Sequence, residues 1–366
     1  MDKDPPDRPQ LVRARAAVVG EAWQSERVET AREVLTALAR RYAFGDLAAL
    51  CEAGAAGLRP DVTAEVRLLC SFGQRLIDLD AEDFGVPERT GDPVVDAHKV
   101  PDDLLARARA SRMPQSAKER TRGALRTLRP AYGLLLEVIE ARWRRREMAG
   151  LVAAVHIAAE YLPLLAWEPV LGHAGDPALL PAAVGGAGSR FGVIPEPGKP
   201  RECDLTRPEQ SAAERALRVA GEPGPGWRAY LDRQHSTLAS ALGRCAASCR
   251  TPCDVVTRLS PEVLDPLSAR CRLAQEFSDG ALVRLRHAAP VGHGFGVPSQ
   301  EEVEEAWSRT RRSVGNQPLG RAVAEPSTVY CLPGLPEVFS AAAGRPILPD
   351  TLLHDVAAHI VDVLER

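Results

Sequence analysis

The chain has 366 residues, of which 45% are hydrophobic and 26% are charged, and its formal net charge is −3. This apolar fraction excludes a disordered chain, and the near-neutral balance argues against nucleic acid or another polyanion as a general partner. Aromatic residues make up only 5% of a chain rich in Ala, Leu, Arg and Glu. The composition therefore predicts a mainly α fold, a multi-helix bundle or irregular helical array in two subdomains with little or no β-sheet.

The predicted N-terminal helical domain spans 11–171. Residues 1–10 before it are charged and Pro-rich and lack an apolar stretch, so we expect a disordered leader, no signal peptide and a cytoplasmic protein. Apolar residues then recur at helical spacing from Val28 to Tyr42, a short helix is expected at 46–52, and Pro60 opens a third helix. These helices predict an antiparallel unit. The acidic, Pro-containing stretch that follows, 79–101, is predicted to be a loop.

A long helical segment is expected from Ala131 to about Leu162. Its basic run is Arg142, Arg144, Arg145 and Arg146, and we expect these arginines to be exposed and Trp143 between them to be buried. The longest apolar stretch, 151–171, contains His156, Glu160, Pro163 and Pro169. It predicts a buried helix followed by a turn and not a membrane span.

His156 and Glu160 are four residues apart on this apolar helix. The spacing places both side chains on one face, where they could form an acid–base couple or half of a metal site. A hydrogen-bonded polar pair at the edge of a core has the same pattern, because buried ionisable groups are usually paired.

The Gly- and Pro-rich stretch 172–208 is predicted to be a linker or a functional loop, and 209–366 a C-terminal helical domain. Helices are expected near 208–220, over 226–250, from Ser260-Pro261, from Ser299 and over 349–366. Ser260, followed by Pro261, is expected to cap its helix, and Ser299, followed by Glu301 and Glu302, is expected to start another. A short strand is expected at 328–332.

Four of the eight cysteines lie close together in the sequence: Cys245, Cys249, Cys253 and Cys271. The first two share a helix face, and Thr251-Pro252 would place Cys253 in the first turn of a new helix, where a thiolate is favoured. Four thiolates suit Zn²⁺ or an iron–sulfur cluster, with His235 as a substitute ligand. A redox pair, or small hydrophobic side chains filling a seam between helices, would have the same sequence.

The segment Arg286–His293 has an arginine, six intervening residues and a histidine. This spacing resembles the active-site pattern of HEPN ribonucleases. The resemblance implies a helical bundle that cuts RNA with Arg286 and His293 as its catalytic pair. Pro290 and Gly292 interrupt the helix that the pattern occupies in that family.

These patterns together predict an intracellular helical binding or scaffold protein that acts through a protein partner or within a larger assembly, without membrane contact. Two alternatives stay open at this point. One is a metal- or iron–sulfur-binding sensor or enzyme that uses the four cysteines. The other is an α-helical enzyme with a small-molecule pocket near His156 and Glu160.

Overall fold

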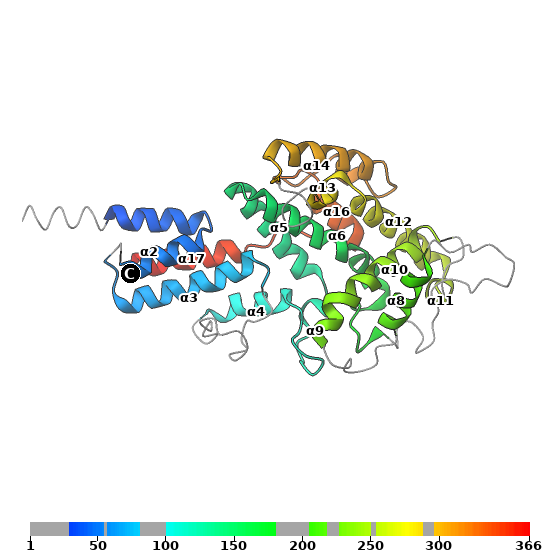
Figure 1. Ribbon diagram of the computed structural model, residues 1–366, viewed down its shortest axis with the longest axis horizontal. Coiled ribbons are helices and arrows are strands. Elements are labelled where there is room, and N and C mark those ends of the chain that lie inside the picture. The colour runs from blue at the N-terminus through cyan, green and yellow to red at the C-terminus, as the bar shows by residue number, and fades with distance from the viewer. Residues whose placement is uncertain are drawn as a thin grey trace, which may run out of the picture. The chain divides into compact units, whose positions relative to one another are not determined.

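The computed structural model describes residues 29–54, 57–80, 100–180, 205–217, 227–249, 254–287 and 296–366. The predicted leader 1–10 and the central parts of the stretches 79–101 and 172–208 lie outside these ranges. The described residues form helices and no strand, which confirms the mainly α prediction (Figure 1).

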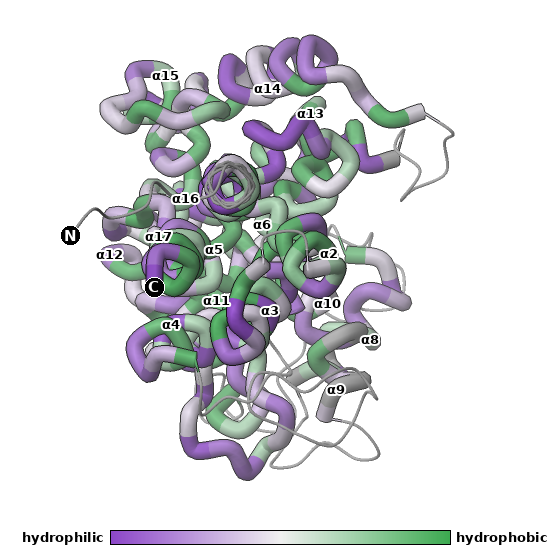
Figure 2. Tube along the Cα trace, turned by 90° about the vertical axis from the view of Figure 1, so that its left-hand side faces the viewer, coloured by the Kyte–Doolittle hydropathy of each residue, from purple (hydrophilic) through white to green (hydrophobic). Residues whose placement is uncertain are grey.

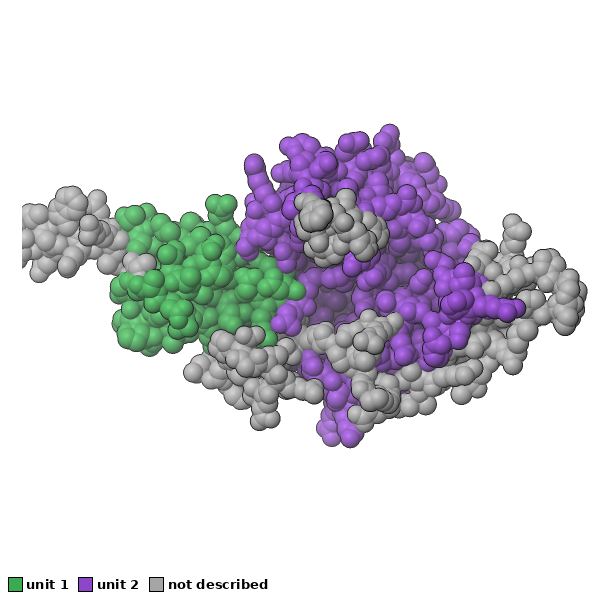
Figure 3. Space-filling model, in the orientation of Figure 1, with its two compact units in different colours: residues 1–78, 87–101, 353–366 green, residues 79–86, 102–352 purple. Residues whose placement is uncertain are grey.

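The chain forms two compact units, coloured separately in Figure 3. Unit 1 comprises Met1–Asp78, Pro87–Pro101 and Leu353–Arg366, and unit 2 comprises Leu79–Val86 and Asp102–Leu352. The C-terminal helix thus belongs to the same unit as the first helices of the chain. The sequence-based boundary at 172–208 stays a prediction, because 181–204 lies outside the described residues.

Unit 1 is helical. Its described helices are 29–40, α2 (Phe44–Glu52), α3 (Pro60–Ile77) and α17 (Leu352–Glu365). Helix α3 begins at Pro60 as predicted, since proline suits the first helical turn, and its whole predicted apolar stripe from Val62 to Ile77 is buried. Helices α2 and α3 pack closely, because a Cβ on Gly73 would lie 2.6 Å from the Phe44 ring.

Unit 2 holds the remaining described helices. They are α4 (Asp102–Ser111), η3 (Gly123–Leu125), α5 (Arg129–Arg145), α6 (Met148–Leu171), α8 (Arg207–Leu217), α9 (Trp227–Tyr230), the π-helical turn η4 (Leu231–His235), α10 (Ser236–Ala247), α11 (Asp254–Thr257), α12 (Pro261–Ser278), α13 (Ala281–Arg284), η5 (Leu285–His287), α14 (Gln300–Gly315), α15 (Arg321–Ala324) and α16 (Leu335–Ala343). Two predicted starts are confirmed. Ser260 is the N-cap of α12, and Ser299 forms a capping box with Glu302 on α14.

Helix α6 forms the centre of unit 2 and contacts α5, α10, α12, α13 and α16. Most residues of α6 are buried, whereas much of α14 is coloured as hydrophilic in Figure 2. The expected turn after 162 is wrong, because α6 continues through Pro163 and Pro169 to Leu171. Pro163 is buried against Gly243 of α10, and this packing compensates for the backbone hydrogen bond that proline cannot donate. Helix α6 is long and apolar enough to cross a membrane, but 56% of its most apolar window is buried inside the protein.

The basic run differs from its prediction. The long expected helix divides into α5 and α6, because Arg146 adopts a left-handed conformation at the end of α5. Arg144 and Arg146 are exposed, whereas Trp143 is only half-buried and Arg142 is largely covered. Arg142 lies against Gly150 and pairs with Glu147, so its side chain covers the start of α6.

The short strand expected at 328–332 is also wrong. These residues are irregular, and the backbone N–H of Thr328 donates to the Glu337 carboxylate on α16. A side-chain acceptor therefore takes the donor that a neighbouring strand would otherwise engage.

Candidate functional site

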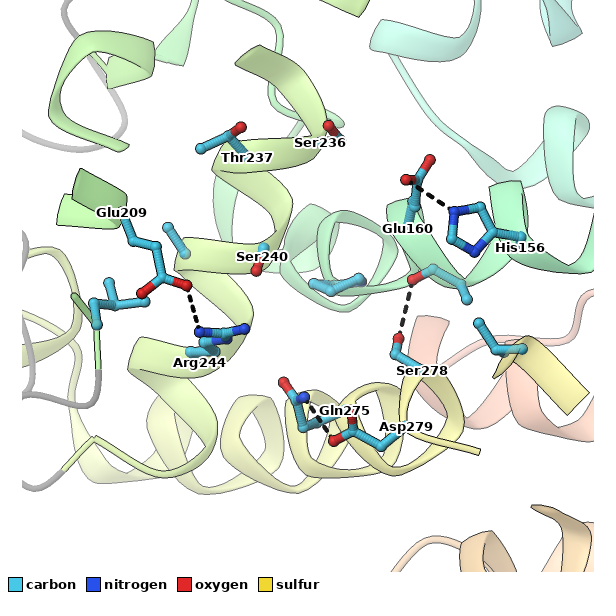
Figure 4. A pocket seen from close by; sticks show the side chains of 15 residues that line it. His156, Glu160, Glu209, Ser236, Thr237, Ser240, Arg244, Gln275, Ser278 and Asp279 are labelled. Atoms are coloured by element: carbon cyan, nitrogen blue, oxygen red, sulfur yellow. Dashed lines mark hydrogen bonds and ion pairs between the residues drawn. The ribbon is translucent and has the colours of Figure 1, made fainter. Parts of the chain in front are cut away.

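A cavity of about 450 Å³ lies in unit 2 between α6, α8, α10, α12 and α13. Side chains from all of these elements line it, and Figure 4 shows the polar ones. The Glu209–Arg244 pair lies on one side, the His156–Glu160 pair on the other, and Gln275, Ser278 and Asp279 lie along a third. This volume is in the range of sites for small molecules.

His156 and Glu160 come from one face of α6 and form a pair in which Nε2 of the ring lies 3.1 Å from Glu160 Oε1. Nε2 also contacts Nη1 of Arg286 on η5. Arginine only donates and a carboxylate only accepts, so Nε2 can satisfy one of these two partners at a time. The buried Nδ1 has no hydrogen-bond partner among the described residues.

The hydrogen bond with His156 lowers the pKa of Glu160 and outweighs burial, which raises it. The charges of His156 and Arg286 lower this pKa further. Glu160 is therefore an ionised carboxylate at neutral pH, at the edge of the cavity.

Glu209 is positioned by the start of α8. Thr206 and Glu209 form a capping box in which the backbone N–H of Thr206 donates to Glu209 Oε2 at 2.6 Å, and the backbone N–H of Glu209 donates to Thr206 Oγ1. The other carboxylate oxygen, Oε1, accepts from Nη1 of Arg244 on α10 at 2.8 Å. The hydrogen bonds with Thr206 lower the pKa of Glu209, and Arg244 adds to this effect.

Helix α10 contributes hydroxyl groups to the cavity, because Ser236 and Ser240 are four residues apart on one face. Helix α12 contributes Asp279 at its C-terminal end, where the carboxylate accepts from the Gln275 amide at 2.9 Å. Ser278 donates to the Ala159 carbonyl of α6 at 3.2 Å, which ties the two walls together.

The cysteines of the predicted metal site take different positions. Cys245 of α10 and Cys271 of α12 are buried on helices that pack together, Cys249 is half-buried beyond the end of α10, and Cys253 lies outside the described residues. Burial raises the pKa of Cys271 to about 12, which favours the neutral thiol. Within the part of the chain that the structure describes, no group of three or more His, Cys, Asp or Glu side chains could hold a metal ion. Because Cys253 is outside, the four-ligand site stays a prediction.

His235, the suggested substitute ligand, is fully buried, and its Nε2 lies 2.9 Å from the Ala174 carbonyl. Beside it, Asp176 makes two hydrogen bonds with Arg122, of 2.7 and 2.8 Å. The side chain of Arg122 in turn covers the ring of Trp227. These polar groups form a buried network in the core of unit 2.

Of the pattern that resembles HEPN ribonucleases, only Arg286 lies within the described residues with a described side chain. It contacts His156 of α6. His293 lies outside, so the proposed catalytic pair stays a prediction. Comparison with protein-family models, with curated proteins and with solved structures finds no match.

Sequence reasoning singled out His156 and Glu160 but missed Glu209, Arg244 and Asp279. The Thr206–Glu209 spacing is a readable capping signal, and it predicts that Glu209 is fixed at the start of a helix. No signal in the sequence indicates that α8, α10 and α12 face the same cavity.

Proposed function

We propose that this chain is a helical binding protein that holds a small, polar, positively charged molecule in the cavity between α6, α8, α10 and α12. The observation that supports this proposal is the lining of the cavity. Among the described residues, its charged side chains are three carboxylates, Glu160, Glu209 and Asp279, and one guanidinium, Arg244, with the His156 ring beside them. A predominantly anionic, partly enclosed site attracts a cation, because charge interactions strengthen away from bulk water.

The hydroxyl groups define the rest of the ligand. Ser236, Thr237, Ser240 and Ser278 line the same cavity. Hydroxyls both donate and accept hydrogen bonds, so they match a ligand that carries hydroxyl or amine groups of its own. An amine with several hydrogen-bonding groups, such as an amino sugar or a polyamine, fits this chemistry.

The His156–Glu160 pair supports acid–base chemistry on the bound molecule as a second candidate function. The ring lies between an acceptor and a donor, and a shift of its proton changes which of them it engages. A role as a scaffold for a protein partner and a metal site at the four cysteines remain proposals from the sequence.

Thermal unfolding and titration calorimetry with matched probes test the binding proposal. Glucosamine, glucose and glucuronate share one ring and differ in charge, and spermidine is a second type of cation. Glucosamine or spermidine is expected to raise the unfolding midpoint, because a ligand that binds only the native state stabilises it. Glucuronate is expected to have no effect. Failure of both cations at millimolar concentration, or equal binding of glucuronate, contradicts the proposal.

Two variants locate the binding. Ser240→Leu fills the cavity and is expected to abolish the shift, whereas Ser308→Leu adds the same bulk on the exposed face of α14 and should leave it unchanged. Glu160→Gln is expected to weaken cation binding by about tenfold, the usual scale for one charge-assisted hydrogen bond. Unchanged binding in both Ser240→Leu and Glu160→Gln would place the ligand elsewhere.

A further inference from the structure

A second cavity of unit 2, of about 550 Å³, lies between α12, α15, α16 and the segment 344–348. It shares no lining residue with the first cavity. The described part of its lining is mostly apolar and small, but it also contains one buried carboxylate, Glu337, and two guanidinium groups, Arg270 and Arg345. The function proposed above makes no use of this combination.

Glu337 lies in the first turn of α16 and is only 7% exposed. One oxygen, Oε1, accepts from the backbone N–H groups of Ser327 and Thr328 at 3.1 and 2.9 Å. The other, Oε2, is buried and has no hydrogen-bond donor among the described residues. Burial of a carboxylate oxygen without a hydrogen-bond donor is unfavourable in free energy, so a donor group on a ligand would stabilise this atom.

The two arginines supply the opposite charge to the same cavity. Arg270 projects from α12 against Gly344, where a Cβ would collide with its guanidinium, and Arg345 follows Gly344 on the segment that closes the cavity. No hydrogen bond or ion pair within the described residues engages either guanidinium. Guanidinium groups bind carboxylates with paired hydrogen bonds, so these two are suited to a carboxylate ligand.

An apolar surface completes the cavity. Leu319 and Leu348 are 36% and 61% exposed, and both line it together with Pro266 and Ala341. Exposed leucines beside a cavity favour an apolar portion on the ligand, because covering them removes apolar surface from water.

The segment that carries Arg345 and Leu348 is held in place before any ligand binds. The Ser340 hydroxyl accepts from the backbone N–H of Ile347 at 2.9 Å and donates to the Pro336 carbonyl at 2.8 Å. The backbone N–H of Asp350 donates to the Gly133 carbonyl at 3.0 Å. A fixed wall lowers the entropy that binding would otherwise cost.

We infer that this second cavity binds a zwitterion with an apolar body, either a free apolar amino acid or a short apolar peptide. The ligand's ammonium donates to Glu337 Oε2, its carboxylate accepts from Arg270 and Arg345, and its side chain covers Leu319 and Leu348. Both sources share these groups, and the volume is in the range for either.

Titration calorimetry with L-leucine and the dipeptide leucyl-leucine, on the full chain, tests the inference and separates the two sources. Isocaproate is leucine without the ammonium group, and isoamylamine is leucine without the carboxylate. Each truncated probe is expected to bind at least about tenfold more weakly than the better of the two zwitterions. Isocaproate leaves the buried Glu337 carboxylate without its donor, and isoamylamine leaves Arg270 and Arg345 without their carboxylate.

Variants assign each group. Glu337→Gln keeps an acceptor for Ser327 and Thr328 and removes the charge, so leucine and isocaproate should bind this variant alike. Arg345→Gln changes an exposed side chain and is expected to reduce the preference for leucine over isoamylamine, because Arg270 alone then binds the carboxylate. Arg309→Gln, an exposed arginine of α14, is the matched control and should bind as the wild type does.

The Ser240→Leu variant keeps this test independent of the first cavity, since it fills that cavity and should leave leucine binding unchanged. If neither zwitterion binds the wild type at millimolar concentration, the inference is wrong. It is also wrong if Glu337→Gln and Arg345→Gln both fold and bind the four probes as the wild type does. Should Glu337→Gln fail to fold, the result with Arg345→Gln decides alone.

Discussion

Acidification should destabilise the protein through His235. The ring is fully buried, it packs against Tyr161 in a tilted arrangement with ring centroids 5.4 Å apart, and its Nε2 lies 2.9 Å from the Ala174 carbonyl. The pKa of His235 is lowered from 6.5 to about 4, mainly by burial. Backbone hydrogen bonds and the charge of Asp176 oppose this shift only in part, and the nearby His173 adds to it. Between about pH 4 and pH 6.5, the His235 ring is therefore mostly neutral in the folded protein and mostly charged in the unfolded chain.

The sign follows from proton uptake. Below pH 6.5 the unfolded chain binds a proton that the folded protein excludes until about pH 4, so stability is fully present above pH 6.5 and is lost as the pH falls towards 4. A pKa shift of this size corresponds to a total loss of about 3 kcal/mol in the free energy of unfolding. About 2 kcal/mol of it falls between about pH 7 and about pH 5. Burial also lowers the pKa of His173, which adds to the loss in the same direction.

Urea unfolding followed by far-ultraviolet circular dichroism, at several pH values over this range, measures the effect. His235→Gln keeps an amide N–H that can donate to Ala174 and removes the titration. Its free energy of unfolding should therefore depend less on pH than that of the wild type, by about 2 kcal/mol over this range. His354→Gln replaces an exposed histidine of α17 and serves as the control. Parallel pH profiles for the wild type and His235→Gln would refute the reasoning.

Three further predictions concern stability and are measured by the same urea unfolding at neutral pH. Asp176→Asn breaks a buried ion pair with Arg122 and should cost about 3 kcal/mol, and a loss below about 1 kcal/mol would contradict a buried, charge-paired network. Leu162→Ala removes a side chain of α6 that has no exposed surface, and it should lower the free energy of unfolding by about 3 kcal/mol. An unchanged free energy of unfolding in this variant would contradict the prediction. Ser299→Ala removes the cap of α14 and should cost about 1 kcal/mol, whereas Ser308→Ala, on the exposed face of the same helix, should change little.

Local signals in the sequence were sufficient for the fold class and for several helix starts. Pro60, Ser260 and Ser299 mark real starts, and the stripe of α3 is buried as its period predicts. These features depend on residues within one or two turns of each other, so a sequence pattern contains all the information that they need.

Where local signals compete with packing, the sequence was misleading. Pro163 does not end α6, because its ring is buried against Gly243 of a helix that is distant in the chain. Residues 328–332 do not form a strand, because Glu337 takes a backbone donor there. Trp143 was predicted to be the one buried residue of the basic run, but it is only half-buried.

The two cavities show most clearly which features the sequence determines and which depend on how the helices pack. The spacing of His156 and Glu160 indicates from the sequence that they form a pair, since both lie on one turn of α6. That Arg244 and Asp279 line the same cavity as this pair depends on how α6, α10 and α12 pack. That Glu337 keeps one oxygen without a donor among the described residues likewise appears only when α16 is placed against α12 and the segment after Gly344. The sequence determines the helices and their polar faces, but the packing of apolar surfaces decides which polar faces meet, because burial is non-directional and brings together residues that are far apart in the chain.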